Sequence, residues 1–240
     1  MPKSWVFFLR QGSSVKYLIA PGLVHHNKKY GLKFGEIEKY WEKRFSLEGE
    51  RTIGLIGHAQ EMQDELYQKR YSFILPHIPR DLYIMDYGCG VGRYSHFFDK
   101  TKYVGVDISI DLLGIAERNN PGYLYYKLKK PIPESINFKP QMFFTATVLQ
   151  HNCNTVVVEI FKELSKLVDD KILLCLYENT SINKGDYHIA FRKVEEYMKL
   201  ISNVFKIEES THDKHVIHKE EHSLMIIKCS TKEGNYENSN

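Results

Sequence analysis

Beyond residue 80, short runs of apolar residues alternate with segments in which apolar residues recur at helical spacing. The runs predict strands, and the periodic segments predict the helices between them. The predicted strands are 82–85, 103–106, 123–128, 141–148 and 171–177, and the predicted helices are 111–119, 154–168 and 190–202. Two final runs, 205–209 and 222–229, have no helix between them and predict an antiparallel pair. This alternation favours an α/β fold: a doubly wound, mostly parallel sheet of seven strands, closed at one edge by the antiparallel pair.

The segment before this sheet also carries helical periodicity. Residues 36–45 and 58–75 predict two amphipathic helices, and prolines end the second one before the first core strand. We expect an N-terminal segment with a helical lid over 1–79, the main domain over 80–229, and a mobile polar tail over 230–240.

Residues 1–30 are less regular, and they leave two interpretations open. The apolar runs Trp5–Leu9 and Val15–Ala20 flank Gly12-Ser13-Ser14, which is typical of a hairpin. The alternative is a segment that packs on a partner.

The first core strand ends in a carboxylate and a glycine-rich turn. Its apolar run leads into Asp86-Tyr87-Gly88-Cys89-Gly90-Val91-Gly92-Arg93, and the amphipathic stretch Tyr94–Phe98 comes next. This order predicts a strand, a tight turn and the start of a helix. The second strand ends in Asp107, so a glycine turn and an acid are expected at one edge of the sheet. A dinucleotide site needs a third glycine where Arg93 stands, which makes NAD a poor fit.

The pattern Asp-x-Gly-x-Gly-x-Gly from Asp86 to Gly92, with Asp107 after the next strand, resembles the class I S-adenosylmethionine-dependent methyltransferases. The resemblance covers roughly residues 80–229 and includes the closing pair, which dinucleotide-binding domains usually lack. It implies a Rossmann-like fold with S-adenosyl-L-methionine as the cofactor. It also implies that the glycine turn lies against the methionine end and that Asp107 binds the ribose hydroxyls. A glycine-rich turn without a ligand is the alternative.

The resemblance also assigns the cofactor contacts. Arg93 is expected to reach the methionine carboxylate, the alternative being a solvated arginine of the first helical turn. Leu128 stands where many relatives carry an acid for the adenine amine, so backbone groups are expected to make that contact. The predicted cofactor-binding residues are Asp86, Gly88, Cys89, Gly90, Arg93, Asp107, Ile108, Leu128 and Thr147.

Two stretches bear on the reacting end of the site. Phe144–His151 resembles the Val-Leu-x-His stretch of many small-molecule O- and N-methyltransferases. His151 titrates near neutrality, so it is the candidate general base or acceptor-orienting group, with packing beside the cofactor as the alternative. Glu178, at the end of the fifth strand, is the second catalytic candidate. Tyr40–Phe45 resembles a segment that closes the cofactor pocket in small-molecule methyltransferases, the alternative being an ordinary surface helix.

The acceptor is predicted to be a small molecule. Phe144–His151 departs from the Asn/Asp-Pro-Pro-Tyr motif of amino-methylating DNA enzymes and lacks the first acid of the ribose 2′-O-methyltransferase tetrad. The formal net charge is only +3, with basic residues spread along the chain, which also disfavours a nucleic-acid partner. A hydroxyl of a sugar, a nucleotide-linked sugar or a secondary metabolite is favoured over nitrogen. The alternatives are a methyltransferase acting on RNA or protein, and a non-catalytic binding protein with the same fold.

Cysteine and histidine usage excludes other classes of site. The four cysteines are far apart, which disfavours a disulfide scaffold or zinc site and favours a cytoplasmic location. The run Trp5–Leu9 is too short to cross a membrane. The spacing of His212, His215, His218 and His222 allows a metal cluster, but the surrounding lysines and glutamates favour a solvated loop or hairpin, and no metal is expected. The oligomeric state is left open.

Overall fold

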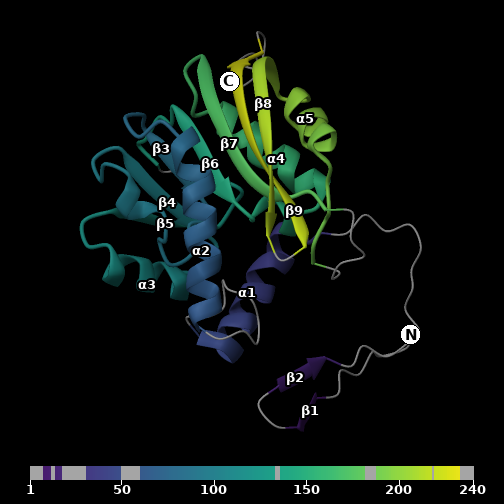
Figure 1. Cartoon of the computed structure of the whole chain (residues 1–240). Coiled ribbons are helices and arrows are strands. Elements are labelled where there is room, and N and C mark those ends of the chain that lie inside the picture. Colours follow the sequence, from purple (N-terminus) through teal and green to yellow (C-terminus); the bar gives the residue numbers. More distant parts are fainter. Residues whose placement is uncertain are drawn as a thin grey trace.

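The computed structural model describes residues 8–11, 14–17, 31–49, 60–132, 136–181, 188–217 and 219–232. Its main body is a seven-stranded sheet with helices on both faces (Figure 1). The strands are β3 (Ile84–Tyr87), β4 (Tyr103–Asp107), β5 (Leu124–Lys127), β6 (Met142–Ala146), β7 (Lys171–Asn179), β8 (Phe205–Ile217) and β9 (Glu220–Thr231). The helices are α1 (Phe34–Glu48), α2 (Gln60–Ile74), α3 (Ile110–Asn119), α4 (Asn154–Ser165) and α5 (Val194–Ser202). Short 3-10 helices lie at Leu75–His77, Ser95–Phe97 and Leu149–His151.

The strand order in the sheet is β5-β4-β3-β6-β7-β9-β8. The first five strands in this order are parallel, and β9 pairs antiparallel with both β7 and β8. The predicted doubly wound sheet with a closing antiparallel pair is therefore confirmed. The chain winds outward in one direction from β3 and in the other from β6. Ligands of such sheets bind where the winding reverses, at the carboxyl ends of these two strands.

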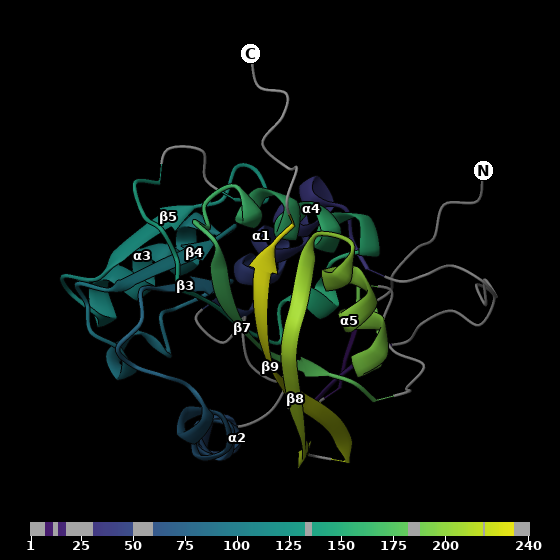
Figure 2. The ribbon, with the colours of Figure 1, turned by 90° about the horizontal axis from the view of Figure 1, so that it is seen from above.

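Alternate residues of the central strands pack on opposite faces of the sheet. Met85 and Val104 point into the core formed with α1, α4 and α5, whereas Ile84 and Tyr103 pack on the α2 side. Figure 2 shows α2 on one side of the sheet and α1 and α4 on the other. Strands covered on both faces need continuous apolar runs, and this explains why the core strands stood out in the sequence.

The N-terminal strands β1 (Phe8–Gln11) and β2 (Ser14–Tyr17) pair antiparallel. Of the two interpretations left open, the structure therefore has the hairpin pairing, shifted along the chain from the predicted runs. The predicted mobile tail lies outside the described residues from 233 onward.

The helix expected from Tyr94 onward is wrong, because the chain makes only the 3-10 turn Ser95–Phe97 there. Tyr94 and Phe98 both turn into the core on the α2 side. The hydroxyl of Ser95 lies 3.0 Å from that of Tyr103, to which it donates, and 2.7 Å from that of Tyr125. These contacts lead the chain directly into β4 and leave no room for a longer helix.

The boundaries predicted for α4 and α5 also need correction. Helix α4 begins at Asn154 as expected but ends at Ser165 instead of residue 168, and its N-cap residue Cys153 makes no side-chain cap. The Asn154 side chain instead accepts a hydrogen bond from Arg192 Nε at 2.8 Å. Helix α5 begins at Val194 instead of residue 190, because Ala190 donates its N–H to the Gln150 carbonyl at 2.6 Å. The segment before α5 is extended and binds the turn that follows β6.

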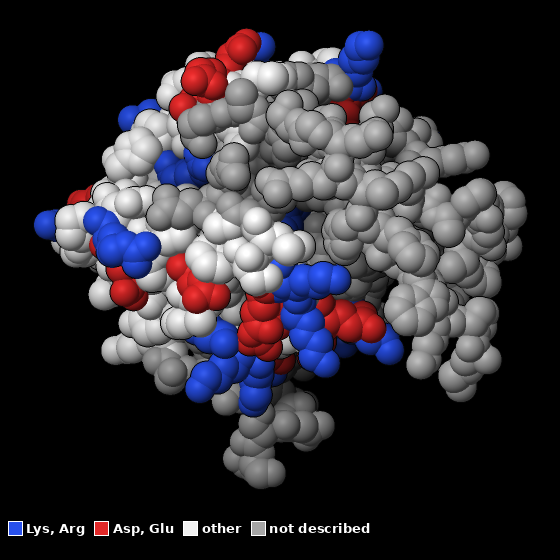
Figure 3. Space-filling model, turned by 90° about the horizontal axis from the view of Figure 1, so that it is seen from below, with Lys and Arg blue, Asp and Glu red and all other residues white. Residues whose placement is uncertain are grey.

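The closing hairpin is longer than predicted, and three of the four clustered histidines lie in its strands. His212 and His215 lie within β8, and His215 stands opposite His222 of β9. The described part of the chain holds no group of three His, Cys, Asp or Glu residues able to bind a metal. Among the same residues, no helix is long and apolar enough to cross a membrane. Basic and acidic side chains are interspersed where the described surface is visible in Figure 3.

Arg192 provides a test of this packing. Arg192 also donates to the carbonyls of Leu149 and Asn152. We expect Arg192→Met to lower the free energy of unfolding by about 2–4 kcal/mol, because it removes these buried hydrogen bonds and leaves the Asn152 carbonyl without a donor. Urea denaturation measures this change. Lys199→Met on the exposed side of α5 is the matched control and should stay within about 0.5 kcal/mol of the wild type. Equal stability of the two variants would contradict the assigned role of Arg192.

Candidate active site

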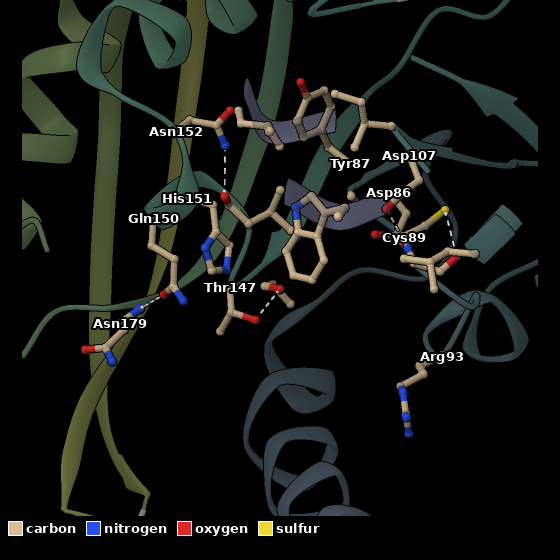
Figure 4. A pocket seen from close by; sticks show the side chains of 18 of the residues that line it. Asp86, Tyr87, Cys89, Arg93, Asp107, Thr147, Gln150, His151, Asn152 and Asn179 are labelled. Carbon is tan, nitrogen blue, oxygen red and sulfur yellow. Dashed lines mark hydrogen bonds between the residues drawn. The ribbon is translucent and has the colours of Figure 1, made fainter. Parts of the chain in front are cut away.

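A cavity of about 400 Å³ opens at the carboxyl ends of β3, β4 and β6, where the winding of the sheet reverses (Figure 4). The sheet edge and the turns after these strands form its floor. Helices α1 and α2 contribute further walls, with Trp41 and Arg44 from α1 and Tyr67 and Arg70 from α2. The two helices predicted ahead of the sheet therefore line the same cavity as the glycine turn.

The turn after β3 requires its glycines for two reasons. Gly88, Gly90 and Gly92 have φ angles of +73°, +55° and +72°, in the left-handed region that other residues avoid. A Cβ on Gly88 would also lie 2.5 Å from a methyl group of Val148, and one on Gly92 would lie 2.7 Å from the Asn120 side chain. Gly88 and Gly90 line the cavity, so backbone forms this part of its wall.

Asp107 lies at the end of β4 and binds the glycine turn that follows β3. Its carboxylate accepts the N–H of Gly90 at 2.9 Å and that of Ser109 at 2.8 Å. Burial raises the pKa of Asp107, while these N–H donors counteract the shift. A carboxylate offers about four acceptor positions, so two remain for a ligand in the cavity that Asp107 lines.

Asp86, at the end of β3, is the second acid of the cavity. It accepts a hydrogen bond of 2.6 Å from the Tyr103 hydroxyl. Burial raises the pKa of Asp86 to about 7, and the neighbouring charge of Asp107 adds to the shift. Asp86 is thus tied to β4 through the Tyr103 hydroxyl, at the start of the glycine turn.

The remaining predicted cofactor residues line the same cavity, namely Cys89, Arg93, Ile108, Leu128 and Thr147. Thr147 has a φ of +59°, a strained conformation for a β-branched residue. Its N–H donates to the Tyr177 carbonyl at 2.7 Å, which holds the strained backbone in place. Leu128 is buried, and its own N–H donates to the Asp107 carbonyl at 2.8 Å.

His151 stands in the cavity at the turn after β6, with 8% of its surface exposed. Its ring meets Trp41 edge-on at 5.3 Å and stacks on His188 at 5.4 Å. Burial lowers the pKa of His151 to about 3, and the nearby His188 and Arg44 add to the shift. Nδ1 is buried and has no partner among the described residues. The imidazole is therefore neutral at pH 7 and presents an unused hydrogen-bonding atom.

Glu178 is not in the cavity wall, which argues against the catalytic role expected of it. Its side chain is fully buried beneath the turn after β6. The carboxylate accepts the backbone N–H groups of Val148, Leu149 and Gln150 at 3.2, 3.0 and 3.1 Å. Burial raises the pKa of Glu178 to about 7, and these N–H groups counteract the shift. Glu178 positions the turn and does not touch the cavity.

Sequence reasoning missed part of the cavity wall. Arg70 lies on the same face of α2 as the buried Leu66 and Ile74, four residues away on each side. A charged residue on the apolar face of a predicted helix was the available signal. His222 of β9 also lines the cavity, and it was seen only as part of a metal-like spacing.

No family model matches the sequence, and no curated protein matches it significantly. Solved structures do match the fold. Phosphoethanolamine N-methyltransferase 1 of Haemonchus contortus, in complex with phosphoethanolamine and S-adenosylhomocysteine, is 13% identical with a TM-score of 0.63, over 85% of this chain and 50% of that one. Magnesium protoporphyrin IX methyltransferase of Synechocystis PCC 6803, with bound S-adenosylhomocysteine, is 17% identical with a TM-score of 0.55. The match covers 82% of this chain and 99% of that one. An S-adenosylmethionine-dependent methyltransferase of Mesorhizobium loti is 12% identical with a TM-score of 0.52. The match covers 68% of this chain and 97% of that one.

These likenesses confirm the fold that the glycine motif predicted. The chain has the Rossmann-like fold of the class I methyltransferases, including the closing antiparallel pair. At identities of 12–17%, such a likeness establishes the architecture and not the reaction.

The lowered pKa of His151 gives a test of its burial. Below about pH 6.5 the unfolded chain takes up a proton on this imidazole, but the folded chain does not until about pH 3, so folding loses stability as the pH falls. Between about pH 7.5 and about pH 5 this loss is about 2 kcal/mol. We expect the free energy of unfolding of His151→Asn to fall by about 2 kcal/mol less than that of the wild type when chemical denaturation is measured across that pH range. Identical pH slopes in both proteins would contradict the lowered pKa.

Proposed function

We propose that this protein is an S-adenosylmethionine-dependent methyltransferase that acts on a small-molecule acceptor. The observation that carries the proposal is the placement of Asp107 and the glycine turn on one wall of a cavity at the switch point of the sheet. Asp107 is tied to Gly90 by a hydrogen bond, so acid and turn form one rigid element.

The residues present fit the proposed cofactor. Asp107 keeps free acceptor positions for a ribose diol, and the buried side chains of Ile108, Leu112 and Leu128 offer an apolar wall for adenine. Arg93, which is expected to reach the methionine carboxylate, has no carboxylate partner among the described residues. When bound, S-adenosylmethionine supplies a methyl group activated by a sulfonium.

The acceptor is assigned to the part of the cavity beside Thr147 and His151. Helices α1 and α2 cover this region, so residues 1–79 are proposed to act as the lid and residues 80–229 as the catalytic domain. A cavity of about 400 Å³ lies in the range of small-molecule sites. The printed names of two structural neighbours, with phosphoethanolamine and magnesium protoporphyrin IX, support a small acceptor for this fold.

A hydroxyl acceptor remains our preference, with His151 as the group that orients it. A neutral imidazole can accept or donate one hydrogen bond at its unused Nδ1. A pKa of about 3 makes His151 a weak base, so its contribution is positioning more than proton removal. Protonation of His151 is therefore not expected to lower turnover near pH 6.5, where an ordinary imidazole titrates.

The other functions considered from the sequence are less well supported. RNA or protein substrates need an open surface, whereas two helices cover this cavity and charges of both signs mix on the visible face. The four cysteine thiols are all free, which supports a reducing cytoplasmic setting as part of the proposal.

The cofactor assignment is tested at Asp107. We expect Asp107→Asn to weaken S-adenosylhomocysteine binding by about 10- to 100-fold, because it removes charge-assisted hydrogen bonds to the ribose. Asparagine keeps one oxygen, so one of the two backbone N–H donors, Gly90 or Ser109, loses its acceptor, and thermal melting checks that the variant folds. Asp111→Asn, exposed at the start of α3, is the control for charge and should bind like the wild type. If calorimetry detects no binding of S-adenosylhomocysteine to the wild-type protein, the proposal is wrong.

The role of His151 is tested by turnover. We expect His151→Ala to lower the rate of labelled methyl transfer to a panel of small hydroxyl compounds by about 10- to 100-fold, with cofactor affinity nearly unchanged. The exposed His96 serves as the control, and His96→Ala should leave the rate unchanged. Near pH 6.5 the rates of the wild type and of His151→Ala should depend on pH in the same way, because burial lowers the pKa of His151 to about 3. A decline seen in the wild type alone is not expected. Such a decline would restore His151 as a general base.

A further inference from the structure

Two arginines from different elements meet at one aromatic ring of the cavity. The guanidinium carbon of Arg93 lies 3.8 Å from the centre of the Tyr67 ring, and that of Arg70 lies 5.4 Å from it. All three residues line the cavity. Within the described chain, neither arginine has a carboxylate partner, and the Nε atom of each is buried without a hydrogen bond.

This arrangement is incomplete by itself. Two guanidinium groups beside one ring repel each other, and the attraction of each to the face of Tyr67 is modest. A partly buried cation is normally paired with an anion, because removing it from water is otherwise costly. The arginines therefore define a place where negative charge from a ligand is favoured.

The surroundings of Arg70 place it at the acceptor end of the cavity. Its guanidinium also lies 5.9 Å from the ring centre of Tyr177, on which His222 stacks at 5.2 Å. Nδ1 of His222 is buried and has no hydrogen-bond partner among the described residues. Burial, and then the charge of Arg70, lower the pKa of His222 to about 3. Arg70 thus stands beside a neutral imidazole that lines the cavity and keeps one unpaired ring nitrogen.

One acid also lines this end of the cavity. Glu220 accepts a hydrogen bond of 2.9 Å from the Asn179 side chain. It lies outside ion-pair distance of both Arg70 and Arg93, so their positive charge is not neutralised within the described chain.

We propose that the methyl acceptor carries an oxyanion, either a phosphate ester or a carboxylate, and that Arg70 binds it. The inference rests on the proposed function, in which Arg93 takes the carboxylate of the cofactor. Each of the two guanidinium groups then has one anion to bind. A guanidinium fork can bind two oxygens of one oxyanion, and His222 can add a third hydrogen bond. The acceptor would thus be held by its charged group beside Tyr177, with its hydroxyl toward His151.

The test titrates inorganic phosphate, and separately acetate, into the full-length protein saturated with S-adenosylhomocysteine. We expect one of these anions to bind at a single site, and the arm that binds distinguishes phosphate from carboxylate. Arg70→Gln should weaken its binding by about 10- to 100-fold, with S-adenosylhomocysteine affinity unchanged within about twofold. Arg70→Lys, which keeps the charge but not the fork, should give an intermediate affinity.

Lys69→Gln is the matched control. Lys69 is the neighbour of Arg70 on α2, and its exposed side chain pairs with Glu65 instead of facing the cavity. Its loss removes the same charge from the same helix and should leave anion binding unchanged within about twofold. If Arg70→Gln does not fold by thermal melting, the comparison of Arg70→Lys with Lys69→Gln decides.

Three results would overturn the inference. The first is that neither anion binds to the wild-type protein. The second is that Arg70→Gln and Lys69→Gln lose anion affinity equally. The third is that Arg70→Gln loses S-adenosylhomocysteine binding but keeps anion binding. The last result would assign Arg70 to the cofactor. A wild-type protein that fails to bind S-adenosylhomocysteine overturns the proposed function instead, and the same anion titrations without the nucleoside still test Arg70.

Discussion

The geometry of the candidate site depends on the turn 148–152 and on two buried charged groups that hold it. Glu178 accepts three of its N–H groups from below, and Arg192 donates to the carbonyls of Leu149 and Asn152. Every carbonyl from Val148 to Asn152 accepts a hydrogen bond. Buried backbone groups left unpaired would each cost about 1–3 kcal/mol, and the turn lies beyond the ladder of the sheet that would otherwise pair them. The two charges therefore allow the chain to leave β6 and bring His151 into the cavity.

The same turn fixes the start of the helix that covers the site. Leu32 donates its N–H to the His151 carbonyl at 2.9 Å, and its own carbonyl accepts the N–H of Cys153 at 3.0 Å. The backbone approaches so closely that a Cβ on Gly31, whose φ is +109°, would lie 2.7 Å from the Asn152 carbonyl oxygen. Helix α1 begins two residues after Leu32 and carries Trp41 to the His151 ring. Helix α1 and the turn that carries His151 are thus built as one unit, so α1 is part of the site and not an independent appendage to the sheet.

Local patterns in the sequence were sufficient for the sheet and for the glycine turn. The core strands are buried on both faces, so their apolar runs were continuous, and the spacing of Asp107 from Gly90 follows from one crossover between adjacent parallel strands. Properties set by distant segments could not be predicted. The role of Glu178 is set by a turn almost thirty residues earlier in the chain, and the burial of His151 is set by α1 and His188. The start of α5 was misplaced for the same reason, because residues 190–192 have helix-compatible side chains but are bound to that turn.

Two acids and two arginines of the cavity come from different elements, and these charges bear on what its histidines can do. Asp86 and Asp107 lie at the ends of β3 and β4, whereas Arg70 and Arg93 face Tyr67 of α2. In a site of low dielectric constant such an arrangement of charges orients a polar ligand before any contact is complete. His151 and His222, buried and with pKa values of about 3, stay neutral at physiological pH. A protonated imidazole at either position would repel a sulfonium and add to the charge of the arginines. Under the proposed function, this neutrality would let both histidines offer hydrogen bonds beside a cationic methyl donor without opposing its binding.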